Sequence, residues 1–248
     1  MTDYLDTPEA RRIAYNFTPG TGPGVVFLGG FKSDMEGTKA LALEAWARAQ
    51  GRAFLRFDYS GHGVSGGAFD EGAIGDWYED ARDAILALTE GPQVLVGSSM
   101  GGWISLLMAR EHPEKVAGLV TIAAAPDFTE DGYWASFDKE TRHKLESEGF
   151  VEVPSEYGDP YVITRRLINE GRTRLVLRSP LALPFPTRFL QGTADASVTS
   201  ETALRLLDHA QGEDMRLTLL KGADHRFSTP ECLGLIEAAL AEVLGALQ

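Results

Sequence analysis

Two hydrophobic periodicities follow one another along the chain. Short apolar runs rich in β-branched residues, such as GVVFLGG at 24–30, are separated by longer stretches with apolar residues every three or four positions. Short runs of this kind are typical of strands buried on both faces, and the longer spacing is typical of amphipathic helices. The pattern predicts an α/β fold, with a mostly parallel sheet and helices on both faces. We expect strands at 24–30, 53–61, 93–98, 115–124, 187–192 and 215–222, and helices at 38–51, 74–91, 102–112, 198–211 and 232–247.

The alternation of strands and helices stops near residue 126 and resumes near 185. The interrupting segment is rich in aromatic residues and prolines and falls between two predicted strands. Parallel sheets bind ligands at the carboxyl ends of their strands. We therefore expect a core of residues 1–125 and 185–248 and a small helical cap, 126–184, over a site at that edge. An ordinary peripheral subdomain is the alternative.

Composition and charge narrow the partners. The chain has 248 residues, a formal net charge of −13 and a single cysteine, Cys232. This acidic balance, without a basic run, argues against a nucleic-acid partner. No apolar run approaches the roughly 18 residues of a membrane span, so no stable membrane insertion is expected. The N-terminus has no apolar signal segment, and a lone cysteine fits a reducing compartment, so we expect a cytoplasmic protein.

A glycine-flanked serine lies where a predicted strand meets a predicted helix. In QVLVGSSMGGWIS, only Ser99 fits the centre of G-x-S-x-G, because Ser98 is flanked at two residues by Val96 and Met100. The motif turns so tightly from strand to helix that its neighbours must be small, and the turn raises the serine hydroxyl above the sheet. Ser99 is therefore the candidate nucleophile.

A serine nucleophile needs a base and an acid that orients the base. In hydrolases whose nucleophilic serine lies on a tight turn between a strand and a helix, the three residues follow one another along the chain in the order serine, acid, histidine. His225, in LLKGADHRFS, is the histidine that follows a late strand, and Asp195, in FLQGTADASV, precedes it after another strand. Asp127 and Asp224 are rival acids. The remaining histidines lie before the serine, at a helix end, in the cap or inside a helix: His62, His112, His143 and His209.

An oxyanion hole needs two N–H donors near the serine. We expect one from Met100, directly after the nucleophile, and one from Phe31, in the loop VVFLGGFKSD after the first long strand. The chemistry calls for no cofactor and no metal. The expected substrate is a small-molecule ester or thioester, with an acylated protein as a further candidate.

Several segments together resemble a known family. LGGFKSDMEGTKA, FDYSGHGVSGG, LVGSSMGGWISLLMA, HPEKVAGLVTIAAAPDF and ADHR are similar to the mitochondrial palmitoyl-protein thioesterase type of α/β-hydrolase domain protein, also called mycophenolic acid acyl-glucuronide esterase. The resemblance covers about residues 25–230 and is weakest within 128–175. It implies an α/β-hydrolase fold, a serine hydrolase acting on thioesters or activated esters, depalmitoylation as one activity, and Ser99, Asp195 and His225 at the matching positions.

Two other functions remain open at this stage. SMGGW also occurs in carbon–carbon bond hydrolases of ring-fission products, and some proteins of this fold are non-catalytic receptors for small ligands. A ring-fission product is a dianion, and arginines near the end of the cap, among them Arg178, are candidates to hold its carboxylate; a solvated helix face is the alternative. Trp134 is a candidate to contact an acyl chain.

Overall fold

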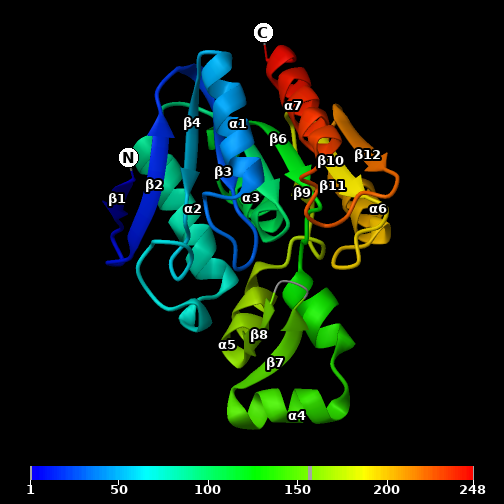
Figure 1. Cartoon of the computed structure of the whole chain (residues 1–248). Helices are drawn as coiled ribbons and strands as arrows, with labels where there is room; N and C mark the ends of the chain where they lie inside the picture. The colour runs from blue at the N-terminus through cyan, green and yellow to red at the C-terminus, as the bar shows by residue number, and fades with distance from the viewer. Residues whose placement is uncertain (1, 156–157, 248) are drawn as a thin grey trace.

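The computed structural model describes residues 2–155 and 158–247 and confirms the predicted α/β fold. Its main sheet has eight strands in the order β1-β2-β4-β3-β5-β6-β10-β12 (Figure 1). The strands from β4 to β12 in this order are parallel, and β1 and β2 pair antiparallel at one edge. Their bounds are β1 Asp3–Asp6, β2 Arg12–Thr18, β3 Thr21–Leu28, β4 Arg52–Phe57, β5 Gln93–Ser98, β6 Val116–Ile122, β10 Thr187–Gly192 and β12 Met215–Leu220.

Helices cover both faces of this sheet. On one face α1 (Thr38–Ala49) and α7 (Pro230–Gly245) bury an apolar stripe against the strands. On the other face α2 (Ile74–Leu88), α3 (Met100–Glu111) and α6 (Ser200–His209) do the same. The nearly continuous apolar character of the central strands follows from this double cover, since both faces of β5 are buried.

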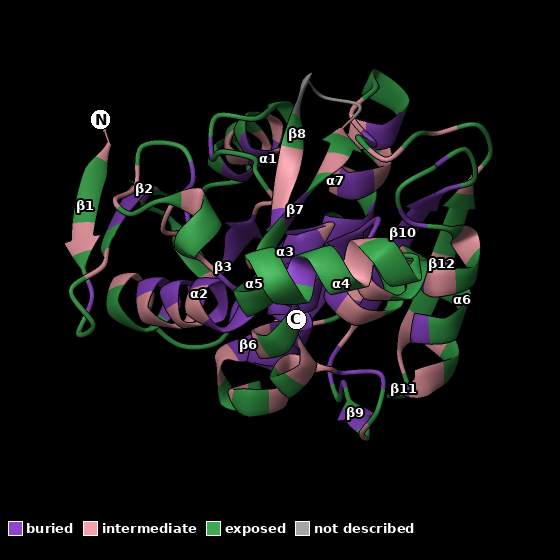
Figure 2. Cartoon of the chain, turned by 90° about the horizontal axis from the view of Figure 1, so that it is seen from below, coloured by how far each residue is buried: buried purple, intermediate pink, exposed green. Residues whose placement is uncertain are grey.

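The segment between β6 and β10 lies below the sheet in Figure 1. It begins with a π-helix, η3 (Phe128–Trp134), and continues with α4 (Lys139–Glu148), β7 (Phe150–Ser155), β8 (Gly158–Thr164), α5 (Arg165–Gly171) and the short 3₁₀ turn η4 (Arg172–Arg174). The end-on view of Figure 2 shows α4 largely exposed on its outer side, while the sheet strands behind it are buried. Two short strands, β9 (Leu181–Ala182) and β11 (Ala210–Gln211), pair beside the main sheet.

The insertion, expected from the sequence to be a small helical cap, also contains the antiparallel pair β7–β8. Its inward positions alternate as a strand requires, with Val151 opposite Ile163 and Val153 opposite Tyr161. Pro154 and Pro160 obscured this alternation, because proline is usually excluded from strand interiors and tolerated only at edges and bulges. Both strands of this isolated pair are edges, and its register shifts between Val153 and Ser155.

Within the residues that the structure describes, no helix is both long enough and apolar enough to cross a bilayer.

Candidate active site

Ser99 lies between β5 and α3 in a strained turn. Its φ of 54° and ψ of −116° are unusual for a residue with a β-carbon. The two motif glycines explain how the turn closes: a β-carbon on Gly97 would collide with the Gly101 carbonyl, and one on Gly101 would collide with the Leu28 carbonyl. The neighbouring Ser98 is buried at the end of β5. Ser99 therefore lies where β5 ends and α3 begins, with its side chain within hydrogen-bond distance of His225.

Ser99, His225 and Asp195 form a continuous row of hydrogen bonds. The Ser99 Oγ lies 3.0 Å from the His225 Nε2, and the His225 Nδ1 lies 2.7 Å from the Asp195 Oδ2. The serine follows β5, the aspartate follows β10 and the histidine follows β12. All three strands are parallel, so their carboxyl ends bring the three side chains to one edge.

The Asp195 carboxylate is fixed on both oxygens. Its Oδ1 accepts the N–H groups of Ser197 at 2.9 Å and Val198 at 2.8 Å, and its Oδ2 also accepts the Gln191 amide at 3.0 Å. Burial of the carboxyl opposes its ionisation, but the hydrogen bonds from His225 and Val198 outweigh this and hold the pKa of Asp195 below its usual value. The acid is thus ionised and aimed at the imidazole.

The two rival acids are engaged elsewhere. Asp127, in the left-handed region with a φ of 58°, accepts the N–H groups of Val176 at 2.8 Å and Leu177 at 3.1 Å. It joins the two chain segments that enter and leave the insertion, and burial raises its pKa. Asp224 accepts the N–H of Phe227 at 3.2 Å, a local turn bond.

The loop after β3 lies against Ser99. A β-carbon built on Gly30 would lie 3.5 Å from the Ser99 β-carbon, so Phe31, the next residue, has its backbone beside the Ser99 side chain. Met100 is the first residue of α3, where the helix leaves N–H groups without intrahelical partners. These are the two backbone positions at which the sequence predicts an oxyanion hole.

A cavity of about 890 Å³ opens at this point. One side is aromatic and apolar, and its rings surround Phe31 at centroid distances of 5.6 Å for Phe128 and 5.5 Å for Tyr161. Tyr133, from the same π-helix as Phe128, also lines it. The other side is polar and comes from the loop after β3, the start of α1 and the loops after β10 and β12: Ser33, Asp34, Thr38, Lys39, Ser197, Arg226 and Ser228.

Comparisons with known proteins show the family of the chain. Residues 24–152 match the model of the family described as serine aminopeptidase, S33. Palmitoyl-protein thioesterase ABHD10, mitochondrial, from Bos taurus is 35% identical over 98% of this chain and 80% of its own length, and the Homo sapiens protein of that name has the same identity and coverage. The chain belongs to the α/β-hydrolase family. The resemblance drawn from the sequence is confirmed.

The solved structure of mouse alpha/beta hydrolase domain-containing protein 10 superposes on this α/β-hydrolase with a TM-score of 0.93, at 33% identity and with each chain fully covered. This agreement extends over the insertion as well as the sheet. Family membership, with full-length similarity to a thioesterase, makes this α/β-hydrolase a serine hydrolase of esters or thioesters.

The expected cytoplasmic location is wrong. The curated relatives that cover 98% of this chain are named as mitochondrial. The expectation failed because a single free cysteine, the buried Cys232, indicates only that the protein works under reducing conditions. It does not distinguish one reducing compartment from another.

Two predicted substrate contacts of this α/β-hydrolase do not lie at the cavity. Trp134 follows Tyr133 but packs under the guanidinium groups of Arg142 and Arg172, whose central carbons lie 5.0 and 4.4 Å from its ring centroid. Arg178 binds the carboxylates of Asp127 and Asp131 instead of facing the cavity. The signal that separates Tyr133 from Trp134 is their position on a π-helix, which no periodicity of 3.6 residues reveals.

Proposed function

We propose that this chain hydrolyses thioesters or esters of medium to long acyl chains through an acyl-enzyme on Ser99. The hydrogen-bonded row from Ser99 to Asp195, beside a cavity with an aromatic side, is the observation that carries this proposal. Family membership supports the reaction class, while the residue roles rest on this geometry.

The reaction begins with proton transfer from the Ser99 hydroxyl to the His225 Nε2 as Oγ bonds to the acyl carbon. Negative charge develops on the carbonyl oxygen, where the backbone N–H groups of Phe31 and Met100 stabilise it. Collapse of the tetrahedral intermediate breaks the carbon–sulfur or carbon–oxygen bond, and His225 returns its proton to the leaving group. Water then attacks the acyl carbon of the acyl-enzyme as His225 Nε2 takes one of its protons. The bond from the acyl carbon to the Ser99 Oγ breaks, His225 returns the proton to that oxygen, and the carboxylic acid is released.

Asp195 supports this cycle without exchanging a proton. It holds the His225 Nδ1–H and thereby keeps Nε2 free to accept the serine proton. Its low pKa keeps it ionised beside the imidazolium that forms in each half-reaction. Because the Ser197 and Val198 N–H groups fix the other oxygen, the imidazole stays oriented toward Ser99.

The aromatic side of the cavity is proposed to hold the acyl chain. The segment 126–184 acts as a cap that supplies Phe128, Tyr133 and Tyr161, and a cavity of about 890 Å³ is in the size range that encloses most of a ligand. A palmitoyl group on a protein cysteine, as named for the mitochondrial relatives, is one such substrate. The polar side of the cavity then receives the leaving group.

Carbon–carbon bond hydrolysis is less well supported, because the cap arginines already have partners. Four of them contact carboxylates: Arg166 contacts Asp76, Arg172 contacts Glu130, Arg174 contacts Glu170, and Arg178 contacts Asp127 and Asp131. Recruiting any of them to a dianionic substrate would first break an ion pair.

The deciding experiment is labelling with a fluorophosphonate probe, followed by turnover of acyl thioesters of increasing chain length. We expect the probe adduct on Ser99, turnover of a palmitoylated cysteine peptide, and higher kcat/KM for medium and long chains than for acetyl. An unlabelled Ser99, or an adduct on Ser98, would contradict the proposal.

A further inference from the structure

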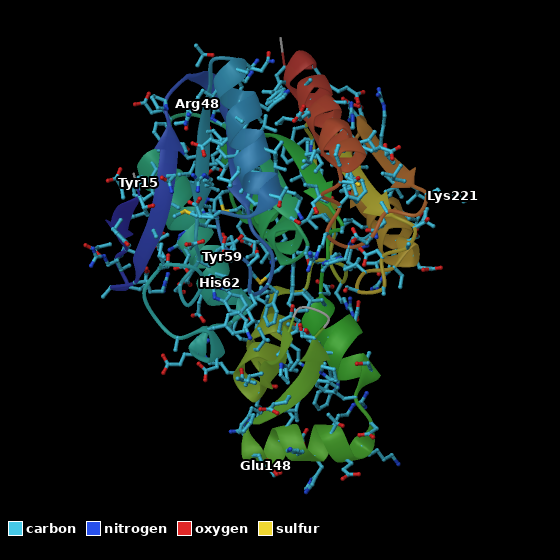
Figure 3. All side chains as sticks on the ribbon, viewed as in Figure 1. Tyr15, Arg48, Tyr59, His62, Glu148 and Lys221 are labelled. Atoms are coloured by element: carbon cyan, nitrogen blue, oxygen red, sulfur yellow. The ribbon has the colours of Figure 1, made fainter. Side chains whose placement is uncertain are left out.

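Three side chains of the loop after β4 bind backbone groups of the loop after β3. This loop carries the motif DYSGHG, residues 58–63, which the reaction described above does not use. Tyr59 and His62 lie where the sheet meets the insertion (Figure 3). The pairs are the Tyr59 hydroxyl with the Gly29 carbonyl at 3.4 Å, His62 Nε2 with the Lys32 N–H at 3.2 Å, and Asp58 Oδ1 with the Met35 N–H at 2.6 Å.

These bonds lie on both sides of Phe31. The Gly30 carbonyl accepts the Ser33 hydroxyl at 2.8 Å and the Ser33 N–H at 3.2 Å. In a planar trans peptide the C=O and N–H point in opposite directions, so the Phe31 N–H points away from Ser33. The next peptide is fixed by the bond from the Lys32 N–H to His62. Lys32 has a φ of 57°, a conformation that needs such support.

His62 can accept that bond in one protonation state only. Its Nδ1 lies 3.1 Å from the Ser60 carbonyl, which accepts, so Nδ1 carries the proton and Nε2 is the acceptor. His62 is 3% exposed, and its ring lies edge-on to those of Tyr59, Phe69 and Trp77. Burial lowers the pKa of His62 to about 4, so it remains neutral at the pH values at which a histidine base works.

The frame behind His62 is also fixed. The Ser60 carbonyl accepts the Trp77 indole N–H at 3.1 Å, and the Ser60 N–H and hydroxyl both donate to Asp80. Asp80 in turn accepts Arg11 at 2.6 Å. His62 is therefore connected through Ser60 and Asp80 to α2, and through Arg11 to the start of β2. These connections give it the rigidity that a positioning residue needs.

We infer that His62 is a positioning residue for the oxyanion hole: by accepting the Lys32 N–H, it holds the Phe31 N–H toward the carbonyl oxygen of the substrate. This rests on the proposed function, since it assigns that N–H to the oxyanion. His62 itself touches neither substrate nor Ser99 in this scheme. Its effect must therefore appear in the transition state and leave substrate binding unchanged.

The test uses two substitutions with opposite expectations. His62→Phe keeps an aromatic ring against Phe69 and Trp77 but has no acceptor, whereas His62→Gln loses the ring but can place its amide oxygen near the Nε2 position. We expect His62→Phe to lower kcat roughly 10- to 100-fold with little change in KM, because removing an oxyanion donor outright costs about 10² to 10³. His62→Gln should retain more of kcat than His62→Phe.

A second readout separates positioning from packing. Affinity for a trifluoromethyl ketone, which forms a tetrahedral adduct on the serine, should fall with kcat/KM in His62→Phe. Affinity for the carboxylic acid product should stay constant. Val64→Ala, in the same loop with a side chain that is 59% exposed, is the matched control and should match wild type in both measurements.

The outcomes are distinguishable. Wild-type kcat in a folded His62→Phe, with reduced kcat in His62→Gln, would mean that the ring only packs and would overturn the inference. If His62→Phe does not fold, His62→Asn, whose shorter amide cannot reach the Lys32 N–H, replaces it with the same expectation. Turnover that is independent of Ser99 in the wild type would instead reject the proposed function.

Discussion

The loops at the carboxyl edge of the sheet and the insertion between β6 and β10 line the same cavity by different means. Ser99, Asp195 and His225 follow directly or closely on strands, and short hydrogen bonds fix them. The insertion contributes rings that pack around Phe31 from a distant part of the chain. In the proposed function, bond breaking thus depends on residues that follow the strands, whereas the shape of the acyl site depends on the packing of the insertion against the core.

Side-chain pairs fasten the insertion to the core. Glu170 accepts the Gly75 N–H at the start of α2 at 2.7 Å and also binds Arg174. Arg166 binds Asp76 on the same helix with both Nη groups. These contacts are partly exposed, and their individual contributions are small, on the order of 1 kcal/mol or less. Substitutions in the insertion should therefore change selectivity and stability more than bond breaking.

The largest difference in kcat should come from the two serines at the turn between β5 and α3. We expect Ser99→Ala to lower kcat by on the order of 10⁶, because a lost nucleophile removes the function of the whole triad. Ser98→Ala, one residue away and buried at the end of β5, should stay close to wild type. Initial rates with a p-nitrophenyl ester and a thioester measure both variants, and circular dichroism checks their folding.

The two aspartates provide the next largest contrast. Asp195→Asn should lower kcat by about 10⁴ with the fold intact, because the amide favours the wrong tautomer of His225. The Asp127 carboxylate accepts the N–H groups of Val176 and Leu177 and the Arg178 guanidinium. In Asp127→Asn the amide N–H₂ cannot accept, so at least one of these donors loses its partner. This substitution should destabilise the protein by roughly 1–3 kcal/mol and largely spare kcat.

Kinetics and urea unfolding of both variants test this pair. A crippled but stable Asp127→Asn together with an active Asp195→Asn would mean that the acid lies after β6.

The sheet edge could be predicted from the sequence because its determinants are local. Strand periodicity located β5, β10 and β12, and the glycine frame singled out Ser99. The order serine, acid, histidine then gave Asp195 and His225, which the structure brings within hydrogen-bond distance of each other. The glycines two residues on either side of Ser99, together with the ends of the strands, are sufficient to predict this part of the site.

The insertion could not be predicted in the same way. Whether Tyr133 or Trp134 faces the cavity depends on the pitch of a π-helix, and the bonds from Asp127 to Val176 and Leu177 join residues about 50 positions apart. The role of His62 also depends on a contact between two loops. None of these relations leaves a local pattern of apolar and polar residues.

Chain-length selectivity should separate the two neighbours on the π-helix. Each enclosed methylene contributes roughly 0.8 kcal/mol, or about fourfold in kcat/KM. Tyr133→Ala removes part of the aromatic side of the cavity and should flatten the dependence of kcat/KM on acyl length, with acetyl turnover little changed. Trp134→Ala should lower kcat/KM by the same factor at every acyl length or reduce only stability, since the Trp134 ring contacts Arg142 and Arg172. A flattened profile in Trp134→Ala alone would reverse the assignment.

The smallest effect concerns the polar side of the cavity, which the core supplies through α1. Lys39 Nζ donates to the Arg226 carbonyl at 2.5 Å, and burial lowers the pKa of Lys39 to about 8. Burying its charge costs stability, so Lys39→Met should raise the free energy of unfolding at pH 7 by on the order of 1 kcal/mol. Between the folded pKa of about 8 and the ordinary lysine value near 10.4, the unfolded chain binds more protons than the folded one, so wild-type stability rises with pH. The advantage of Lys39→Met should therefore shrink across that window. Urea unfolding at pH 7 and pH 10 measures the change, with Lys139→Met, at an exposed lysine of α4, as the control. If the free energy of unfolding of Lys39→Met exceeded that of wild type by the same amount at both pH values, the pKa of Lys39 would not be lowered in the folded protein.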